Sequence, residues 1–340
     1  MLGRKYRPVV IMGCPRSGTN LLHDILVSAG GFAVYRGRLP VYHVLIPRFG
    51  KLDRSENRAK LMAAWVHTEG FRRTQLDPQE LTAKVMDECR CGGDFLRIVM
   101  QQIAQKQNAS RWIIYSPEML LLIPIVRKEI PDALFLHIIR DGRDVALSLR
   151  KLGGFNPLPW QQNTRSLQET ALYWKWLVKK GRRYGREIAD DYMEVHFEDL
   201  IGDPGRTLAR LSKFLDHPLD LDQIRDSALG TVKNSNSAFQ EEISGSTFEP
   251  VQRWKRKLTE KEVAALQWHI GNTLEALGYP LAPLQCASRP GIKDRLLSLA
   301  YLPFLDTKFW LKLNTPLGRF ARSAELNSKH QSSQPSDDRY

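Results

Sequence analysis

The fold is decided by a stretch near the start of the chain, Val9-Val10-Ile11-Met12-Gly13-Cys14-Pro15-Arg16-Ser17-Gly18-Thr19-Asn20. Its first four residues are apolar, which is typical of a strand buried in a parallel sheet, and Gly13 then opens a loop. After Gly18, apolar residues recur at helical spacing until Gly30-Gly31 ends the helix. The stretch therefore predicts a strand, a glycine loop (residues 13–18) and a helix in direct succession.

The glycine loop has features of an anion-binding turn. Its glycine spacing matches the phosphate-loop pattern GxxxxGK[ST], but Thr19 and Asn20 stand where that pattern has a lysine and a hydroxyl residue. Glycines let backbone N–H groups approach a phosphate, and the following helix directs its positive end at the anion. Arg16 can supply the missing cation, whereas magnesium-dependent nucleotide hydrolysis is disfavoured. The structural alternative is an ordinary glycine turn after a strand.

The rest of the chain alternates strand and helix patterns. Further strands are predicted at 112–115, 133–139 and 192–197. Helices are predicted at about 54–108, 119–129 with a kink or break at Pro124, 165–186, 204–216 and 260–276. Such alternation predicts an α/β protein with a P-loop-like three-layer fold, in which helices cover both faces of a mostly parallel sheet. Ligands of such sheets bind beyond the carboxyl ends of the strands.

A second candidate anion-binding turn follows the predicted strand at 133–139. Arg140 leaves the strand end, and Ser148 lies two helical turns further on. An arginine can hold a phosphate through two parallel hydrogen bonds, and a serine adds a neutral donor. The alternative is a surface network of ion pairs among Arg140, Asp141, Arg143 and Asp144. Either aspartate is better suited to capping the helix or positioning an arginine than to acid catalysis.

Four segments, in this order, resemble the sulfotransferase family: residues 13–20, 137–148, 192–204 and 248–255. The resemblance covers about residues 8–282 and is strongest to bacterial sulfotransferases with a PRSGT loop, which tyrosylprotein sulfotransferases share. It implies that the chain uses 3'-phosphoadenosine-5'-phosphosulfate as co-substrate. The glycine loop would then hold the 5'-phosphosulfate, Arg140 and Ser148 the 3'-phosphate, and residues 248–255 would close over the cofactor. The implied cofactor-binding residues are Cys14, Pro15, Arg16, Ser17, Gly18, Thr19, Asn20, Arg140, Ser148, Arg253 and Trp254.

The sequence departs from the family at both expected catalytic positions. Tyr115 and Ser116 stand where many members have a lysine-threonine pair, and Gly37-Arg38 stands where PRSGT members often have Gly-Glu. Transfer still requires that charge on the bridging oxygen be stabilised and that the acceptor lose a proton. We assign the first role to Arg16, with Arg38 as an additional candidate. Glu118 is the first candidate for the base and His43 the second, and the scheme needs no metal.

The net charge of +13 predicts an anionic partner. Nucleic acid is disfavoured, because the chain has neither zinc-finger spacing nor a long basic arm. Four cysteines without a CxxC pair, and no apolar stretch of membrane-spanning length, favour the cytoplasm. We expect a sulfotransferase-like domain over 1–287, a helical appendage over 288–322 and a disordered tail over 323–340. Apolar residues at 296–313 suit docking on the domain, a partner or a membrane face.

Three alternatives to a sulfotransferase stay open, and one of them, a peripheral membrane protein that uses residues 296–313, is compatible with the enzyme because the acceptor could be a lipid. A phosphate-loop nucleotide kinase requires a lysine at the position of Thr19, and its absence counts against that reading. A non-catalytic sulfonucleotide-binding or scaffold protein is favoured by the residues found at Tyr115 and Arg38. The acceptor, whether sugar, lipid, peptide or phenol, is not revealed by the sequence.

Overall fold

The structure is a computed structural model that describes residues 3–37, 39–152, 165–226, 250–283 and 291–320. Five parallel strands form one sheet in the order β2-β3-β1-β4-β5. They are β1 (Val9–Met12), β2 (Phe32–Ala33), β3 (Arg111–Tyr115), β4 (Leu134–Ile139) and β5 (Tyr192–His196). Strand β1 is central, and its Val9 pairs with Ile113 on one side and Leu134 on the other. The carboxyl ends of β1, β3 and β4 therefore meet at one edge of the sheet.

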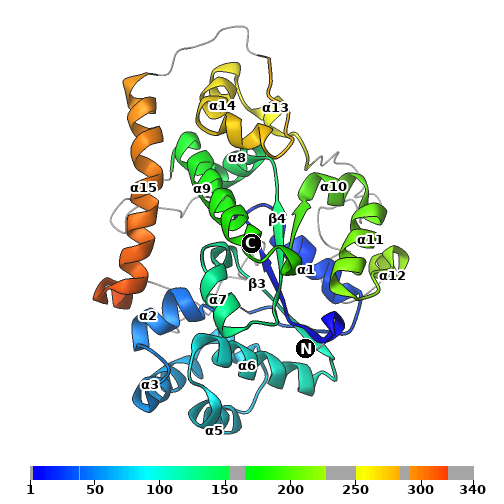
Figure 1. Ribbon diagram of the computed structural model, residues 1–340, viewed down its shortest axis with the longest axis vertical. Coiled ribbons are helices and arrows are strands. Elements are labelled where there is room, and N and C mark those ends of the chain that lie inside the picture. The colour runs from blue at the N-terminus through cyan, green and yellow to red at the C-terminus, as the bar shows by residue number, and fades with distance from the viewer. Residues whose placement is uncertain (1–2, 38, 153–164, 227–249, 284–290, 321–340) are drawn as a thin grey trace, which may run out of the picture.

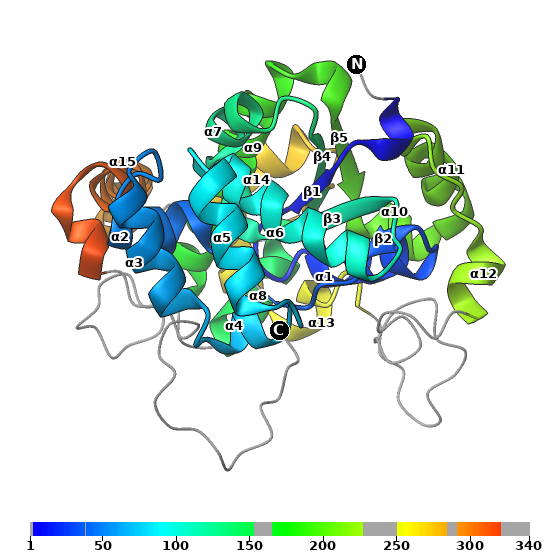
Figure 2. The same ribbon diagram turned by 90° about the horizontal axis from the view of Figure 1, so that it is seen from below.

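Helices cover both faces of this sheet (Figure 1 and Figure 2). The α-helices are α1 (Thr19–Ser28), α2 (Ile46–Phe49), α3 (Ser55–Trp65), α4 (Glu69–Arg72), α5 (Pro78–Glu88), α6 (Gly92–Lys106), α7 (Ile123–Glu129), α8 (Gly142–Leu152), α9 (Leu167–Arg186), α10 (Phe197–Gly202), α11 (Pro204–Leu215), α12 (Leu221–Asp226), α13 (Trp254–Lys257), α14 (Glu260–Glu275) and α15 (Ile292–Asn314). Short 3-10 helices are η1 (Arg4–Tyr6), η3 (Pro117–Leu121), η4 (Ala189–Asp191) and η6 (Pro316–Phe320), and η2 (Val41–Leu45) is a π-helix.

Alternate residues of β1 belong to two separate hydrophobic clusters, one on each face of the sheet. Val9 and Ile11 pack with α1, α11 and α12, whereas Val10 and Met12 pack with α6, α7, α8 and α9. This is the two-residue period of a strand, and because both faces are covered every residue of β1 is apolar and buried. The predicted α/β class with a parallel sheet between helical layers is confirmed.

The element predictions needed four corrections. Strand β2 was missed, because two residues are too short to show a period. The segment 54–108 is four helices, separated where Thr68, Asp77 and Cys91 cap new helix starts. The break within 119–129 falls at Leu122, and Pro124 sits in the first turn of α7, where its missing N–H costs no hydrogen bond. Phe197 begins α10 instead of ending β5.

The described part of the segment 288–322 forms α15 and η6. Helix α15 packs along α9, and the Trp176 indole donates a hydrogen bond to the Asp306 carboxylate at 2.8 Å. Near the start of α15, Ser298 is hydrogen-bonded to the His269 ring at 2.6 Å. Residue 287 and the tail at 323–340 lie outside the described residues. Among the helices described, none has the length and apolar character needed to cross a bilayer.

The buried histidine of β4 gives folding stability a predictable pH dependence. The His137 side chain is fully buried beneath α9 and hydrogen-bonded to the Tyr192 hydroxyl at 2.6 Å. Burial lowers its pKa from 6.5 to about 3, with nearby Arg182 adding to the effect. Because the folded-state pKa lies below the unfolded one, this contribution to stability is present above pH 6.5 and is lost as the pH falls toward 3.

We therefore expect His137→Gln, which cannot titrate, to flatten the acid side of the stability profile. The slope of the unfolding free energy against pH should fall by about 1.4 kcal/mol per pH unit in that window. Urea unfolding at a series of pH values measures it, with His67→Gln at an exposed histidine as the control. Equal slopes in the wild type and His137→Gln would rule out this histidine as the source.

Candidate functional site

The glycine loop connects β1 to α1 with a backbone that few residues other than glycine adopt. Gly18 has a φ of 100°, and a Cβ there would lie 2.6 Å from the Phe197 ring. At Gly13, a Cβ would lie 2.6 Å from the backbone oxygen of Ile138 in β4. Both glycines are thus required by close approach, which draws the loop against the ends of β4 and β5. Arg16 also has a positive φ, 74°.

The predicted loop residues divide into buried and accessible groups. Cys14 and Ser17 are fully buried, Thr19 is nearly so, and Arg16 is exposed. Burial raises the pKa of the Cys14 thiol, so the thiol stays neutral. Only the backbone of Cys14 is therefore a candidate for contact with an anion. The Ser17 hydroxyl has no hydrogen-bond partner among the described residues. A buried hydroxyl in this position is costly unless something else bonds to it.

Two predicted turns that lie far apart in sequence meet in the structure. The Arg16 Nε donates to the Ser148 Oγ at 3.0 Å, linking the glycine loop to α8. The Arg140 Nη1 donates to the backbone oxygen of Arg16, also at 3.0 Å. Arg140 and Ser148 therefore lie within one hydrogen bond of the glycine loop, as the sequence analysis required of a shared ligand.

Arg140 is a buried cation with spare donor capacity. Its side chain is 8% exposed, its guanidinium lies 4.4 Å from the centre of the Phe197 ring, and its Nη2 donates to the Pro250 oxygen at 2.5 Å. The Nε has no partner among the described residues. Burial lowers the pKa of Arg140, and the charges of Arg253 and Arg16 add to that shift, against the opposing carboxylates of Asp144 and Glu198. A guanidinium so placed gains from binding an anion.

The predicted closing segment lies beside Arg140. The backbone N–H of Trp254 donates to the Asp144 carboxylate at 2.8 Å. The Arg143 guanidinium lies 3.8 Å from the centre of the Trp254 ring. Trp254 is 4% exposed, which fixes the segment from 250 to 257 on α8. The neighbouring Arg253 thereby comes close to Arg140. Phe248 and Glu249 lie outside the described residues.

Among the described residues, the alternative of an ion-pair network holds for Arg143, whereas Arg140 forms no ion pair although the charges of Asp144 and Glu198 act on it. Both Asp141 oxygens accept hydrogen bonds from the Arg143 guanidinium, the shortest at 2.7 Å, in a buried pair. Asp141 also accepts the Arg143 backbone N–H at 2.9 Å, as a helix cap does. The Asp144 carboxylate accepts the Trp254 backbone N–H, and burial raises the pKa of Asp144. Asp141 and Asp144 thus position other groups, leaving Arg140 available to a ligand.

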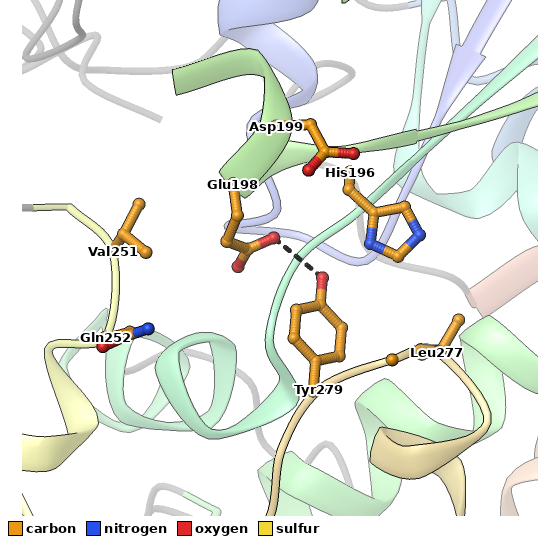
Figure 3. Close-up of a pocket in the computed structure, with 8 residues that line it drawn as sticks. His196, Glu198, Asp199, Val251, Gln252, Leu277 and Tyr279 are labelled. Carbon is orange, nitrogen blue, oxygen red and sulfur yellow. Dashed lines mark hydrogen bonds between the residues drawn. The ribbon is translucent and has the colours of Figure 1, made fainter. Parts of the chain in front are cut away.

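A cavity of about 360 Å³, which the sequence did not predict, lies beside Glu198, one of the carboxylates whose charge acts on Arg140 (Figure 3). Its lining consists of His196, Glu198, Asp199, Val251, Gln252, Leu277, Gly278 and Tyr279. Glu198 connects it to the Arg140 turn, because its carboxylate accepts the Asp141 backbone N–H at 2.9 Å and the Tyr279 hydroxyl at 2.8 Å. Burial raises the pKa of Glu198. Glu198 stands within a motif already noted, whereas nothing near Tyr279 signals a site.

The two candidate bases lie in η3 and η2. Glu118 lies in η3 directly after β3, but its side chain is outside what the structure describes. His43 lies in η2, which packs against α6 and α15. Tyr115, at the family's lysine position, has its ring 4.5 Å from that of the buried His23 on α1. Arg38 is not among the described residues. The roles of Glu118 and His43 stay predictions.

Comparison with known proteins decides the family. Residues 8–221, well over half of the chain, match the profile of a family described as the sulfotransferase family. The chain belongs to the sulfotransferase family. A search of curated proteins gave no match to this sulfotransferase-family chain.

Solved sulfotransferase structures resemble this family member at low identity. The sulfotransferase domain of the Synechococcus PCC 7002 olefin synthase is 19% identical, with a TM-score of 0.49, and the match covers 81% of this chain and 95% of that one. The sulfotransferase domain of the curacin biosynthetic pathway is 13% identical, with a TM-score of 0.49 and coverage of 81% and 99%. Sulfotransferase STF9 from Mycobacterium avium is 16% identical, with a TM-score of 0.45 and coverage of 81% and 78%.

Proposed function

We propose that this protein transfers a sulfuryl group from 3'-phosphoadenosine-5'-phosphosulfate to a hydroxyl or amine acceptor. The observation that carries the proposal is the contact of Arg140 with the Arg16 backbone, which brings two cationic turns within one hydrogen bond of each other. A nucleotide that carries anionic groups at the 3' and 5' positions of one ribose could contact both turns at once. The Arg140 Nε and the Ser17 Oγ, which have no partner among the described residues, offer two further polar atoms for this ligand.

In the proposed complex, the glycine loop holds the 5'-phosphosulfate at the start of α1, while Arg140 and Ser148 hold the 3'-phosphate. Arg253 adds positive charge from the closing segment. The cavity beside Glu198 has the size and the mixed polar lining of a site for part of a small ligand, and we assign it to the nucleoside.

The proposed reaction is an in-line displacement at sulfur. The acceptor oxygen or nitrogen forms a bond to sulfur as the bond from sulfur to the bridging phosphate oxygen breaks. The electron pair of that bond leaves with adenosine 3',5'-bisphosphate, and the acceptor proton passes to the base, for which Glu118 and His43 are the candidates. Arg16 stabilises charge on the leaving oxygen. Positioning and preorganised charge supply most of the acceleration, by analogy with phosphoryl transfer.

One observation favours the non-catalytic alternative, a protein that binds the sulfonucleotide without transfer. Tyr115 occupies the position of the family's lysine and cannot neutralise a sulfuryl group by charge. The nucleotide-kinase alternative lacks comparable support, since Thr19 and Asn20 replace its lysine and hydroxyl residue. A cytoplasmic location stays a prediction from the few cysteines, of which Cys14, Cys89 and Cys91 are unpaired in the structure.

A transfer assay separates these alternatives. The full chain is incubated with donor labelled in its sulfuryl group and with a cell extract, and labelled products are separated and identified. We expect a labelled product that depends on the protein and is suppressed by added adenosine 3',5'-bisphosphate. If the protein binds the bisphosphate but labels nothing, it is a binding protein and the transfer proposal is wrong.

A further inference from the structure

The C-terminal helix α15 is apolar on two opposite sides. Tyr301 and Leu305 are 6% and 3% exposed, and they anchor one side on the body of the protein. The other side carries an outer stripe of apolar residues spaced by four, three, four and seven positions: Ile292, Leu296, Leu299, Pro303 and Trp310. This spacing places all five on one face of a helix. Leu317 and Phe320 of η6, the segment that follows the helix, are also exposed, at 60% and 80%.

The outer stripe is exposed to an unusual degree. Ile292, Leu299 and Trp310 are 78%, 74% and 58% exposed, and α15 lies at the margin of the molecule in both views (Figure 1 and Figure 2). Asp306 lies at the edge of the stripe, where it is bound to α9 through Lys180 at 2.9 Å and Trp176 at 2.8 Å. Contiguous exposed apolar side chains on one face of a helix mark an interaction surface.

Charge identifies the partner. Five basic residues against two acidic ones accompany the apolar side chains between 292 and 320. Of these, Lys293 and Arg295 are exposed beside the start of the stripe and Arg319 beside its end. Basic residues next to a linear apolar face, with a tryptophan on it, are the features of a helix lying in the surface of an anionic bilayer. The remaining tail, 321–340, is predominantly polar and offers little apolar surface to cover the stripe.

We propose that the outer stripe of α15 binds the surface of an anionic lipid bilayer, with the helix lying in the plane of the membrane. The apolar side chains enter the acyl boundary, while the flanking lysine and arginines contact anionic headgroups. The opposite side of α15 stays on α9, so binding needs no rearrangement of the sheet or of the Arg16 and Arg140 turns. The proposal is independent of the transfer reaction.

Vesicle flotation of the full chain tests it without nucleotide or acceptor. We expect the protein to float with vesicles of phosphatidylcholine and phosphatidylserine, to float little with phosphatidylcholine alone, and to be released by salt. The double variant Leu296→Glu with Leu299→Glu should lower binding by about tenfold or more, since two apolar side chains lose their burial in lipid. Ile125→Glu, at an exposed apolar residue of α7, should bind as the wild type does.

Thermal melting and bisphosphate binding check that the double variant is folded, as expected for exposed positions. The proposal is wrong if the wild type does not float, if it binds both vesicles equally, or if the double variant floats like the wild type. Sedimentation of the protein without vesicles tests whether a second copy of the chain occupies the stripe instead. A stable dimer that the double substitution dissociates would assign the stripe to a second copy of the chain and overturn the membrane proposal.

Discussion

Arg140→Ala is expected to weaken binding of adenosine 3',5'-bisphosphate by about a hundredfold. Arg140 is buried, its Nε has no partner in the part of the chain that the structure describes, and it lies where the 3'-phosphate is proposed to bind. Loss of charge-assisted hydrogen bonds in a partly desolvated site costs about 1.5–3 kcal/mol each, and the loss of about 3 kcal/mol corresponds to that factor. Isothermal titration calorimetry measures the change directly.

Arg140 also donates hydrogen bonds to the backbone oxygens of Arg16 and Pro250. A loss of affinity in Arg140→Ala could therefore come from a lost phosphate contact or from a disturbed loop, and the experiment must separate the two. Adenosine 5'-phosphate, which lacks the 3'-phosphate, provides the separation: Arg140→Ala should weaken it far less than the bisphosphate. Arg150→Ala is the matched control, since this exposed arginine of α8 pairs with Glu262 instead. Equal losses for both nucleotides would show that Arg140 only supports the loops.

Arg16→Ala is expected to slow sulfuryl transfer by about a hundredfold or more, with a smaller effect on the affinity for the unreacted donor, whose bridging oxygen does not yet carry the charge. Negative charge grows on the leaving oxygen in the transition state, and an interaction that strengthens there raises kcat more than it tightens binding. Initial rates with the labelled donor, together with calorimetry, separate the two effects.

Arg16→Gly is the control for Arg16→Ala, because of the backbone conformation at this position. Arg16 has a φ of 74°, which glycine adopts without strain, so Arg16→Gly removes the side chain while favouring the loop conformation. Arg16→Gly should therefore be as impaired in transfer as Arg16→Ala even if it is more stable to heat. A glycine variant with wild-type transfer would show that the loop backbone, and not the guanidinium, provides catalysis.

Much of the fold was predictable because buried parallel strands are apolar without interruption. Val9–Met12 and Leu134–Ile139 show this directly, apart from the buried His137. The positions of the two candidate anion-binding turns were predictable because each directly follows such a strand. Their convergence followed from the rule that carboxyl ends of parallel strands share one edge.

The features that sequence missed depend on contacts between distant residues. Glu198 and Tyr279 meet across 81 positions to line the cavity, and no local pattern couples them. Strand β2 is too short for a period and exists because β3 supplies its partner. The base stays a prediction, because Tyr115 and Arg38 stand where the resemblance leads one to expect a lysine and a glutamate.

The most direct test of the central claim is a crystal structure of the protein with adenosine 3',5'-bisphosphate. The account predicts one molecule bridging the two turns, with its 5'-phosphate on the backbone of residues 13–18 and its 3'-phosphate in hydrogen-bond contact with Arg140 and Ser148. A bisphosphate bound with its 3'-phosphate away from Arg140, or bound at another edge of the sheet, would contradict it.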